Sequence, residues 1–239
     1  MLEYLFVPTC YREPSTMPAD LQLALSFLED LRFNNRRDWF EANRKRYEAA
    51  RAATESFVTT VLSQFKTVED VGSTSAKECF FRINRDVRFS KDKAPYKTNF
   101  GIVLGKGGRK ATGRSYYLNL EPGGTFIAAG IYDPSPEQLK HIRAIIAEDP
   151  SKLRKIVNAK DFQHYFGTLK GDTLKTAPKG YDADHPAIDL LKYKQFLAMH
   201  DVTDAGVLAD DFATHVVAVC KALKPLESYF EAIRPNHEA

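Results

Sequence analysis

The spacing of apolar residues changes twice along this chain, and the change limits the folds open to it. Before about residue 66 and after about residue 135, apolar side chains recur every three or four residues, as in helices with one buried face. Between about residues 79 and 132 they alternate with polar ones, as in strands. Because helices and strands fall in separate blocks, the pattern predicts an α+β fold.

The N-terminal block predicts an antiparallel helical hairpin. Its first helix covers about residues 18–31, and its second, much longer helix covers about residues 36–65. Asn34 and Asn35 lie at the join, where one asparagine can adopt the left-handed conformation that ends a helix and the other can cap the next helix. We expect Trp39 to pack in the core between the two helices.

The middle block predicts an antiparallel sheet. Its expected strands cover residues 81–89, 100–104, 115–121 and 125–132. The last two strands are joined by Glu121-Pro122-Gly123-Gly124, and a proline followed by a glycine favours a type II turn. The sheet should therefore contain a tight Pro-Gly-Gly hairpin.

Helices return in the C-terminal block, with one expected exception. Ser135 and Pro136 have the residue types that start a helix. After a loop at residues 170–186, residues 190–201 read as one more strand. The last helix should begin at Thr203 or Asp204. Pro225 should either kink it or begin another helix.

These blocks predict a flexible N-terminal arm of residues 1–17 followed by a single α+β domain over residues 18–239. The domain should consist of an N-terminal helical hairpin, a central antiparallel β-sheet with a Pro-Gly-Gly hairpin, and C-terminal helices packed on the sheet. With 44% hydrophobic residues the chain has enough apolar material for such a core, which excludes disorder over most of its length.

The cysteines and the N-terminal sequence indicate a cytoplasmic protein. Cys10, Cys79 and Cys220 are widely separated and form no CxxC pair, so they suggest neither a zinc knuckle nor a disulfide framework. The N-terminus lacks the basic region of a signal peptide. No apolar stretch approaches the roughly 20 residues that a membrane helix needs, so no membrane partner is expected.

Charge is concentrated in one segment. Between Lys77 and Arg114 there are eleven basic and three acidic residues, a surplus of +8, whereas the whole chain carries +3. The remainder therefore sums to −5. The nearly neutral total argues against a general polyanion binder, but the basic segment is where a single anion would bind.

The densest part of this segment supplies the candidate ligand-binding residues, which are Arg82, Arg85, Asp86, Arg88, Lys93, Tyr96 and Lys97. The three arginines would clamp an anion, and the aspartate would orient their guanidinium groups through bidentate hydrogen bonds. The two lysines and the tyrosine would add contacts from the following loop. No set of nucleophile, base and orienting group is recognisable, so the sequence assigns no reaction and no cofactor.

Two other interpretations of the same segment stay open. Aromatic residues interleave with the basic ones and would stack bases in a nucleic-acid-binding module; they are Phe80, Phe81, Phe89, Tyr96, Tyr116 and Tyr117. Alternatively the charged cluster is a structural ion-pair network in an interaction or scaffold protein, and then no concave pocket should lie near Arg82 and Tyr96.

A second cluster contains Asp182, Asp184 and His185, which would either form a turn or hold a cation. A hard metal ion usually requires more oxygen ligands than these two carboxylates offer. The turn is therefore the favoured interpretation, and no metal site is predicted.

The string from Arg82 to Lys97, R-x-x-R-D-x-R-F-S-K-D-K-x-P-Y-K, resembles the hallmark of the bacterial and fungal family called domain of unknown function 2461. Further agreement lies in Asn34-Asn35 with Trp39-Phe40 and Arg46-Tyr47, in Gly130-Ile131-Tyr132 with Pro136, and in Ala177–Tyr181 with Asp184–Pro186. The resemblance covers nearly the whole chain after the N-terminal arm. It implies emphasis on the arginine-rich string, including Phe89, but no role for any residue, because the family is uncharacterised.

Together these observations predict a cytoplasmic protein that binds, or also acts on, a small anionic or phosphorylated ligand.

Overall fold

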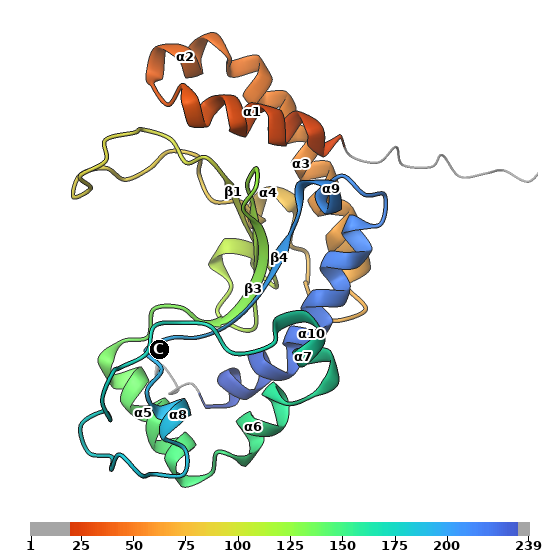
Figure 1. Cartoon of the computed structure of the whole chain (residues 1–239). Helices are drawn as coiled ribbons and strands as arrows, with labels where there is room; N and C mark the ends of the chain where they lie inside the picture. Colours follow the sequence, from red (N-terminus) through yellow and green to blue (C-terminus); the bar gives the residue numbers. More distant parts are fainter. Residues whose placement is uncertain (1–19, 234–239) are drawn as a thin grey trace, which may run out of the picture.

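A four-stranded antiparallel sheet lies at the centre of the molecule (Figure 1). The computed structural model describes residues 20–233, and the arm predicted at residues 1–17 lies outside them. The strands run in the spatial order β1 (Phe100–Leu104), β2 (Tyr116–Leu120), β3 (Thr125–Ile131) and β4 (Phe196–Val202), each antiparallel to its neighbour. The predicted α+β class is confirmed.

The predicted Pro-Gly-Gly hairpin joins β2 and β3. The Gly124 N–H donates to the Glu121 carbonyl at 3.0 Å, and Gly123 has a φ of +65°. A type II turn requires this positive φ at its third residue, which is why a glycine is needed there.

Two long helices and their neighbours cover one face of the sheet. The N-terminal hairpin consists of α1 (Leu21–Phe33) and α3 (Arg44–Phe65), with the short α2 (Arg37–Ala42) at its bend. The C-terminal α10 (Phe212–Ala232) packs against β3 and α3. Around its lower half lie α6 (Ser151–Val157) and α7 (Lys160–Phe166). The predicted packing of C-terminal helices on the sheet is therefore confirmed.

The remaining helices are placed at the ends of the sheet. A lower lobe contains α5 (Pro136–Glu148) and α8 (Ile188–Leu191), which contact each other (Figure 1). Near β1 lie α4 (Ala76–Cys79) and the 3₁₀ turn η1 (Gly108–Lys110), and α9 (Asp204–Val207) follows β4. None of the described helices is both long and apolar enough to cross a membrane.

Alternation along the strands separates a buried face from an open one. Ile102, Leu118 and Ile127 are fully buried on the side of α3 and α10. Their strand neighbours Val103 and Tyr117 project from the opposite face, as the period of two in a strand requires. The open face therefore carries side chains that the packing of the core does not use.

Three predicted elements differ from the structure. The long second helix is divided at Asn43, whose side-chain amide donates to the Trp39 carbonyl at 2.9 Å and so competes with the helical backbone pattern. The strand predicted at residues 190–201 begins only at Phe196, and α8 precedes it. Thr203 caps the separate α9, whereas α10 contains Pro225 in its interior.

The prediction of a strand at residues 81–89 is wrong. Residues 84–96 instead form a projecting loop, here called the basic arm, which shows as the yellow loop at the upper left of Figure 1. Its ends meet in a single bridge between Asn84 and Tyr96. The alternation of polar and apolar residues is present, but Phe89 is 95% exposed at the far end. A strand pattern needs an apolar surface to cover, and none lies under this segment.

Two histidines meet between β4 and α10. The Nε2 atoms of His200 and His215 lie 3.0 Å apart, and His200 Nδ1 lies 3.0 Å from the Tyr165 carbonyl of α7. Only one proton fits between the two Nε2 atoms. Burial, together with His200, lowers the pKa of His215 below its ordinary value, and Asp211 partly opposes this effect.

We expect this pair to make the fold sensitive to acid. The pKa of His215 is lower in the folded state than in the unfolded state. Its contribution to the free energy of unfolding is therefore fully present above the unfolded pKa of about 6.5 and is lost as the pH falls below that value. His215→Gln should therefore reduce the loss of unfolding free energy between pH 7.5 and pH 5, measured by urea denaturation. His141→Gln, at an exposed position of α5, is the control. Equal pH dependence in all three proteins would contradict this assignment.

Candidate functional site

The basic arm is fastened to the helical hairpin through Tyr96. Asn35 donates its side-chain amide to the Tyr96 carbonyl at 2.9 Å and accepts the Tyr96 N–H at 3.0 Å. The Tyr96 ring is only 6% exposed and stacks on Phe40, with 4.0 Å between ring centroids. Tyr96 therefore anchors the arm in the core, whereas the sequence suggested a loop residue that contacts ligand.

Arg85 links the two sides of the basic arm through hydrogen bonds. Its Nη1 donates to the Asp92 carboxylate at 2.5 Å and to the Ala94 carbonyl at 3.1 Å. Asp92 also accepts the Ala94 N–H, and this bond together with that from Arg85 lowers the pKa of the Asp92 carboxyl. Part of the donor capacity of Arg85 is thus used to hold the two sides of the arm together.

The outer part of the arm is held by bonds of Asp86, Arg88 and Lys93. Arg88 donates to both carboxylate oxygens of Asp86, at 3.0 and 2.7 Å, and these bonds lower the pKa of Asp86. Lys93 donates to the Val87 carbonyl at 3.0 Å. All three are exposed. The expected arrangement, in which Asp86 orients several arginines around one anion, is replaced by a local turn.

Lys97 is held in a different way. Its ammonium lies 5.3 Å from the centre of the Phe81 ring, and the side chain is half-buried. Burial, and then the nearby charge of Arg82, lower the pKa of Lys97. Within residues 20–233, neither Lys97 nor Arg82 forms a hydrogen bond or an ion pair through its side chain. With Lys93, which bonds only to a carbonyl, they are the cations of the predicted set that contact no carboxylate of the described residues, and of the three only Lys97 is half-buried and lines a pocket.

A polar pocket of about 400 Å³ opens beneath the arm. Its charged lining comprises three cations, Arg32, Arg85 and Lys97, and one carboxylate, Asp92. The uncharged residues of the lining are Asn35, Ala94, Tyr96, Thr98 and Asn99. Three of the seven predicted residues thus meet around one cavity, while Arg82 stands beside it and Asp86, Arg88 and Lys93 lie outside it.

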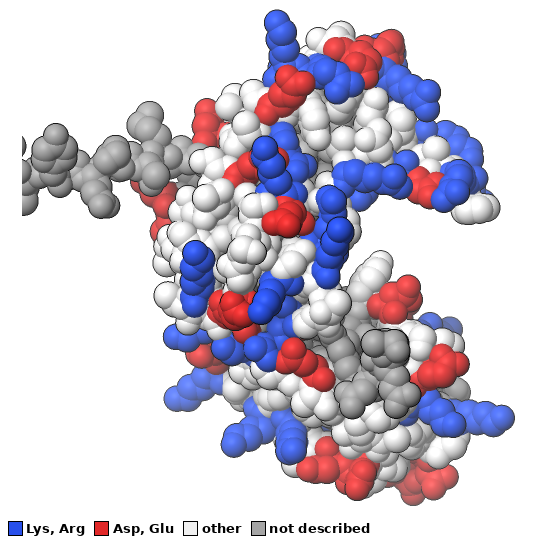
Figure 2. All heavy atoms as spheres, turned by 180° about the vertical axis from the view of Figure 1, so that it is seen from behind, with Lys and Arg blue, Asp and Glu red and all other residues white. Residues whose placement is uncertain are grey.

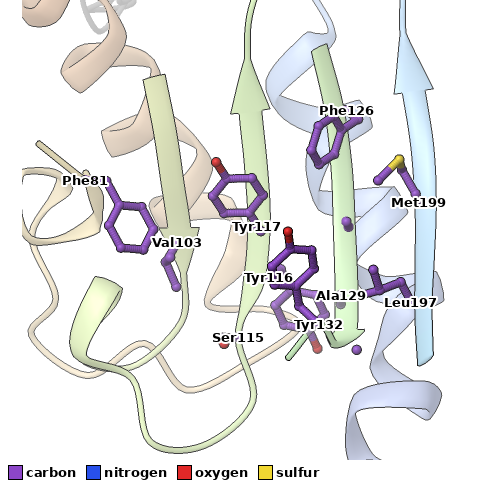
Figure 3. A pocket seen from close by; sticks show the side chains of 12 residues that line it. Phe81, Val103, Ser115, Tyr116, Tyr117, Phe126, Ala129, Tyr132, Leu197 and Met199 are labelled. Carbon is purple, nitrogen blue, oxygen red and sulfur yellow. The ribbon is translucent and has the colours of Figure 1, made fainter. Parts of the chain in front are cut away.

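An apolar cavity of about 530 Å³ lies on the open face of the sheet (Figure 3). We call it the aromatic cavity, and its larger side chains are those of Phe81, Val103, Tyr116, Tyr117, Phe126, Tyr132, Leu197 and Met199. Tyr132 stands at its edge and is 71% exposed. In Figure 2 a notch separates the basic arm from the lower lobe, with Lys and Arg gathered along its upper side.

The polar pocket and the aromatic cavity adjoin at Lys97 and Asn99. Lys97 lines the polar pocket and rests on Phe81, which lines the aromatic cavity. Asn99 also lines the polar pocket, and its amide donates to the Tyr117 hydroxyl at 3.5 Å. The two cavities share no lining residue, but these two contacts place them next to each other, with cations at one and aromatic rings at the other, and make them one candidate site.

The sequence identified part of this site. Phe81 and Tyr117 were among the suggested stacking residues, but Phe80 and Tyr96 are buried in the core. Tyr116 borders the aromatic cavity but is itself fully buried. Phe126 and Tyr132 were missed, although Phe126 lies on β3, Tyr132 directly follows this strand, and their separation of six residues predicts that both face the same side. Arg32 and Asn99 had no signal, because they reach the pocket only through the folding of distant segments.

The other sequence candidates have structural partners. His185 accepts the Ala187 N–H through Nδ1 at 3.1 Å, in the turn favoured for its cluster. Among residues 20–233 no three His, Cys, Asp or Glu side chains are grouped closely enough to hold a metal ion. Burial raises the pKa of the Cys79 thiol to about 11, which leaves it protonated and unreactive at neutral pH.

The model of a protein family described as "Conserved hypothetical protein (DUF2461)" matches residues 23–229 of this chain. The chain belongs to the DUF2461 family. The matched residues include the basic arm and both cavities, and the family resemblance inferred from the arginine-rich string is confirmed. Neither a curated protein nor a solved structure matches the chain. Membership of DUF2461 assigns no activity.

The two arginines of the arm should differ in their effect on its rigidity. Arg85→Ala removes bonds that cross the arm, whereas Arg88→Ala removes bonds only to the adjacent Asp86. Because proteases cleave segments that can open locally, chymotrypsin should cut after Phe89 several-fold faster in R85A than in R88A. Mass spectrometry of the early fragments measures this. Equal rates would show that Arg85 does not hold the arm closed.

Proposed function

We propose that this protein binds a small anionic ligand, with its acidic group in the polar pocket and its apolar part in the aromatic cavity. The observation that carries the proposal is the position of Lys97. Its half-buried ammonium, in contact with no carboxylate, lies where the polar pocket meets the aromatic cavity.

Electrostatics favour an anion at this point. Burial of an ammonium without a counter-charge is unfavourable, and the nearby Arg82 adds repulsion. A bound phosphate or carboxylate would relieve both effects. Arg32 and Arg85 line the same pocket. Arg32 bonds to the Pro122 carbonyl and pairs with Glu29, and Arg85 pairs with Asp92, but a guanidinium has five N–H donors, so each arginine keeps donors for an oxyanion.

The size and lining of the site suit a small molecule. Ligand pockets are commonly about 300–1,000 Å³ and combine apolar walls with a few convergent polar groups. Both cavities lie within that range, at about 400 and 530 Å³. The pocket near Tyr96 also argues against the scaffold interpretation, which predicted that no such pocket would be present.

The seven residues that the sequence predicts to bind ligand have different roles in this site. Lys97 contacts the anion, Arg85 contributes its remaining donors, and Arg82 acts through its charge. Tyr96 fastens the arm. Asp86, Arg88 and Lys93 shape its outer part. We assign no reaction, and the cytoplasmic location stays a prediction.

Hexyl phosphate is a suitable probe because it joins a phosphate to an apolar chain. We expect Lys97→Met to weaken its binding at least tenfold, since the methionine keeps the contact with Phe81 but removes the charge. Lys93→Met, which removes an exposed arm lysine, should change the affinity less than twofold. Isothermal titration at low ionic strength measures both variants.

Two results would overturn the proposal. If K93M weakened hexyl phosphate binding as much as K97M does, the anion would be attracted by the arm as a whole and not by the polar pocket. If the wild-type protein bound none of hexyl phosphate, inorganic phosphate and pyrophosphate at millimolar concentration, the pocket would not be an anion site.

A further inference from the structure

Three aromatic rings form a row across the open face of the sheet. Phe81 lies beside β1, Tyr117 is on β2 and Phe126 is on β3 (Figure 3). The ring centroids are 6.3 Å apart between Phe81 and Tyr117, and 5.9 Å apart between Tyr117 and Phe126. The rings are tilted against one another and leave an open cavity in front of them. The row therefore offers flat apolar surfaces to a ligand.

A glycine makes room for the middle ring. A Cβ atom on Gly101 would lie 2.6 Å from the Tyr117 hydroxyl and 3.3 Å from Phe81. The close approach of Tyr117 to β1 thus depends on the missing side chain.

Polar groups lie at the edge of this row. The side-chain amide of Asn99 donates to Asn119 at 2.5 Å and to the Tyr117 hydroxyl at 3.5 Å. The side-chain oxygen Oδ1 of Asn99 accepts no hydrogen bond within residues 20–233, and Asn99 is one of the residues that line the polar pocket. An acceptor beside aromatic rings can recognise an amino or ring N–H group.

The row of aromatic rings, the acceptor on Asn99 and the cation of Lys97 together suit one kind of ligand. We propose that the site binds a nucleotide unit, with its base stacked on Phe81 and Tyr117 and its phosphate at Lys97. This inference rests on the proposed function and adds the class of ligand. Stacking on an aromatic side chain tolerates any base, because every base presents a π-face.

Two sources could supply that unit, a free nucleotide or a single-stranded nucleic acid. A free nucleotide would use only the cations of the polar pocket. A single strand would continue beyond the site and contact exposed cations of the arm, such as Arg88 and Lys91. The two sources therefore differ in length dependence and in salt dependence.

The first experiment compares etheno-AMP, ribose 5-phosphate and hexyl phosphate on the wild-type protein and on Phe81→Leu. Leucine keeps an apolar side chain but removes the flat ring, and Phe81 is already 38% exposed, so the variant should fold. Etheno-AMP should bind at least tenfold more tightly than ribose 5-phosphate. Phe81→Leu should weaken etheno-AMP binding about five- to 100-fold and hexyl phosphate binding less than threefold.

Phe89→Leu is the matched control, because this exposed phenylalanine lies at the far end of the arm. It should leave the affinity for etheno-AMP unchanged. Fluorescence titration measures etheno-AMP, and isothermal titration measures the other two probes.

A second experiment identifies whether the nucleotide unit comes from a free nucleotide or from a single-stranded nucleic acid. A fluorescein-labelled decamer of thymidylate that binds far more tightly than etheno-AMP, with a steep loss of affinity at higher salt, identifies single-stranded nucleic acid. Binding of the decamer no tighter than that of etheno-AMP identifies a free nucleotide. Both results support a nucleotide unit as the ligand.

The inference and the proposed function fail in different ways. If hexyl phosphate binds and K97M abolishes its binding, but etheno-AMP binds no better than ribose 5-phosphate and F81L has no effect, the nucleotide inference is overturned and the anion site stands. If none of the probes binds the wild-type protein, both are overturned.

Discussion

The central sheet buries only one face in the protein core, and the candidate site depends on that asymmetry. On the buried face, side chains such as Ile102, Leu118 and Ile127 pack towards α3 and α10. Full burial of a large apolar side chain contributes about 1.5–3 kcal/mol, so this face accounts for much of the stability of the sheet. The strict alternation of a strand then directs Val103 and Tyr117 to the other side. The aromatic cavity is therefore a geometric consequence of how the core is built.

The second constraint is how the basic surplus of residues 77–114 is neutralised. Lys106 pairs with Asp70 at 2.9 Å, and Arg114 pairs with Glu69 and Glu231. Burial acts to raise the pKa of Glu69, but bonds from Arg114 and the Tyr116 hydroxyl outweigh it and hold that pKa below its usual range. Part of the positive charge is therefore structural. Lys97 differs from these paired residues because it is half-buried, lines the polar pocket and contacts no carboxylate among residues 20–233.

The sequence predicted the parts of the fold that depend on local pattern. The helical hairpin follows from the 3.6-residue period, and the turn at Gly123 follows from the conformations open to proline and glycine. The basic arm was misread because alternation alone does not show whether a surface exists for the apolar residues to cover. Only the fold shows that Phe89 has no such surface.

The candidate site was predictable only in part, for a related reason. The arginine-rich string points to residues 82–97, three of which line the polar pocket, but charge counting does not distinguish a paired cation from an unpaired one. Tyr96 is fixed by Asn35, which is 61 positions away in sequence. Arg32 enters the polar pocket from the same helical hairpin. Contacts at this separation leave no trace in local spacing.

A crystal structure of the protein with hexyl phosphate tests the central claim most directly. We expect the phosphate within hydrogen-bond distance of Lys97 Nζ in the polar pocket, with the alkyl chain lying along Phe81 and Tyr117. A phosphate bound instead to Arg88 or Lys91 on the outer arm, with the aromatic cavity unchanged, would contradict it.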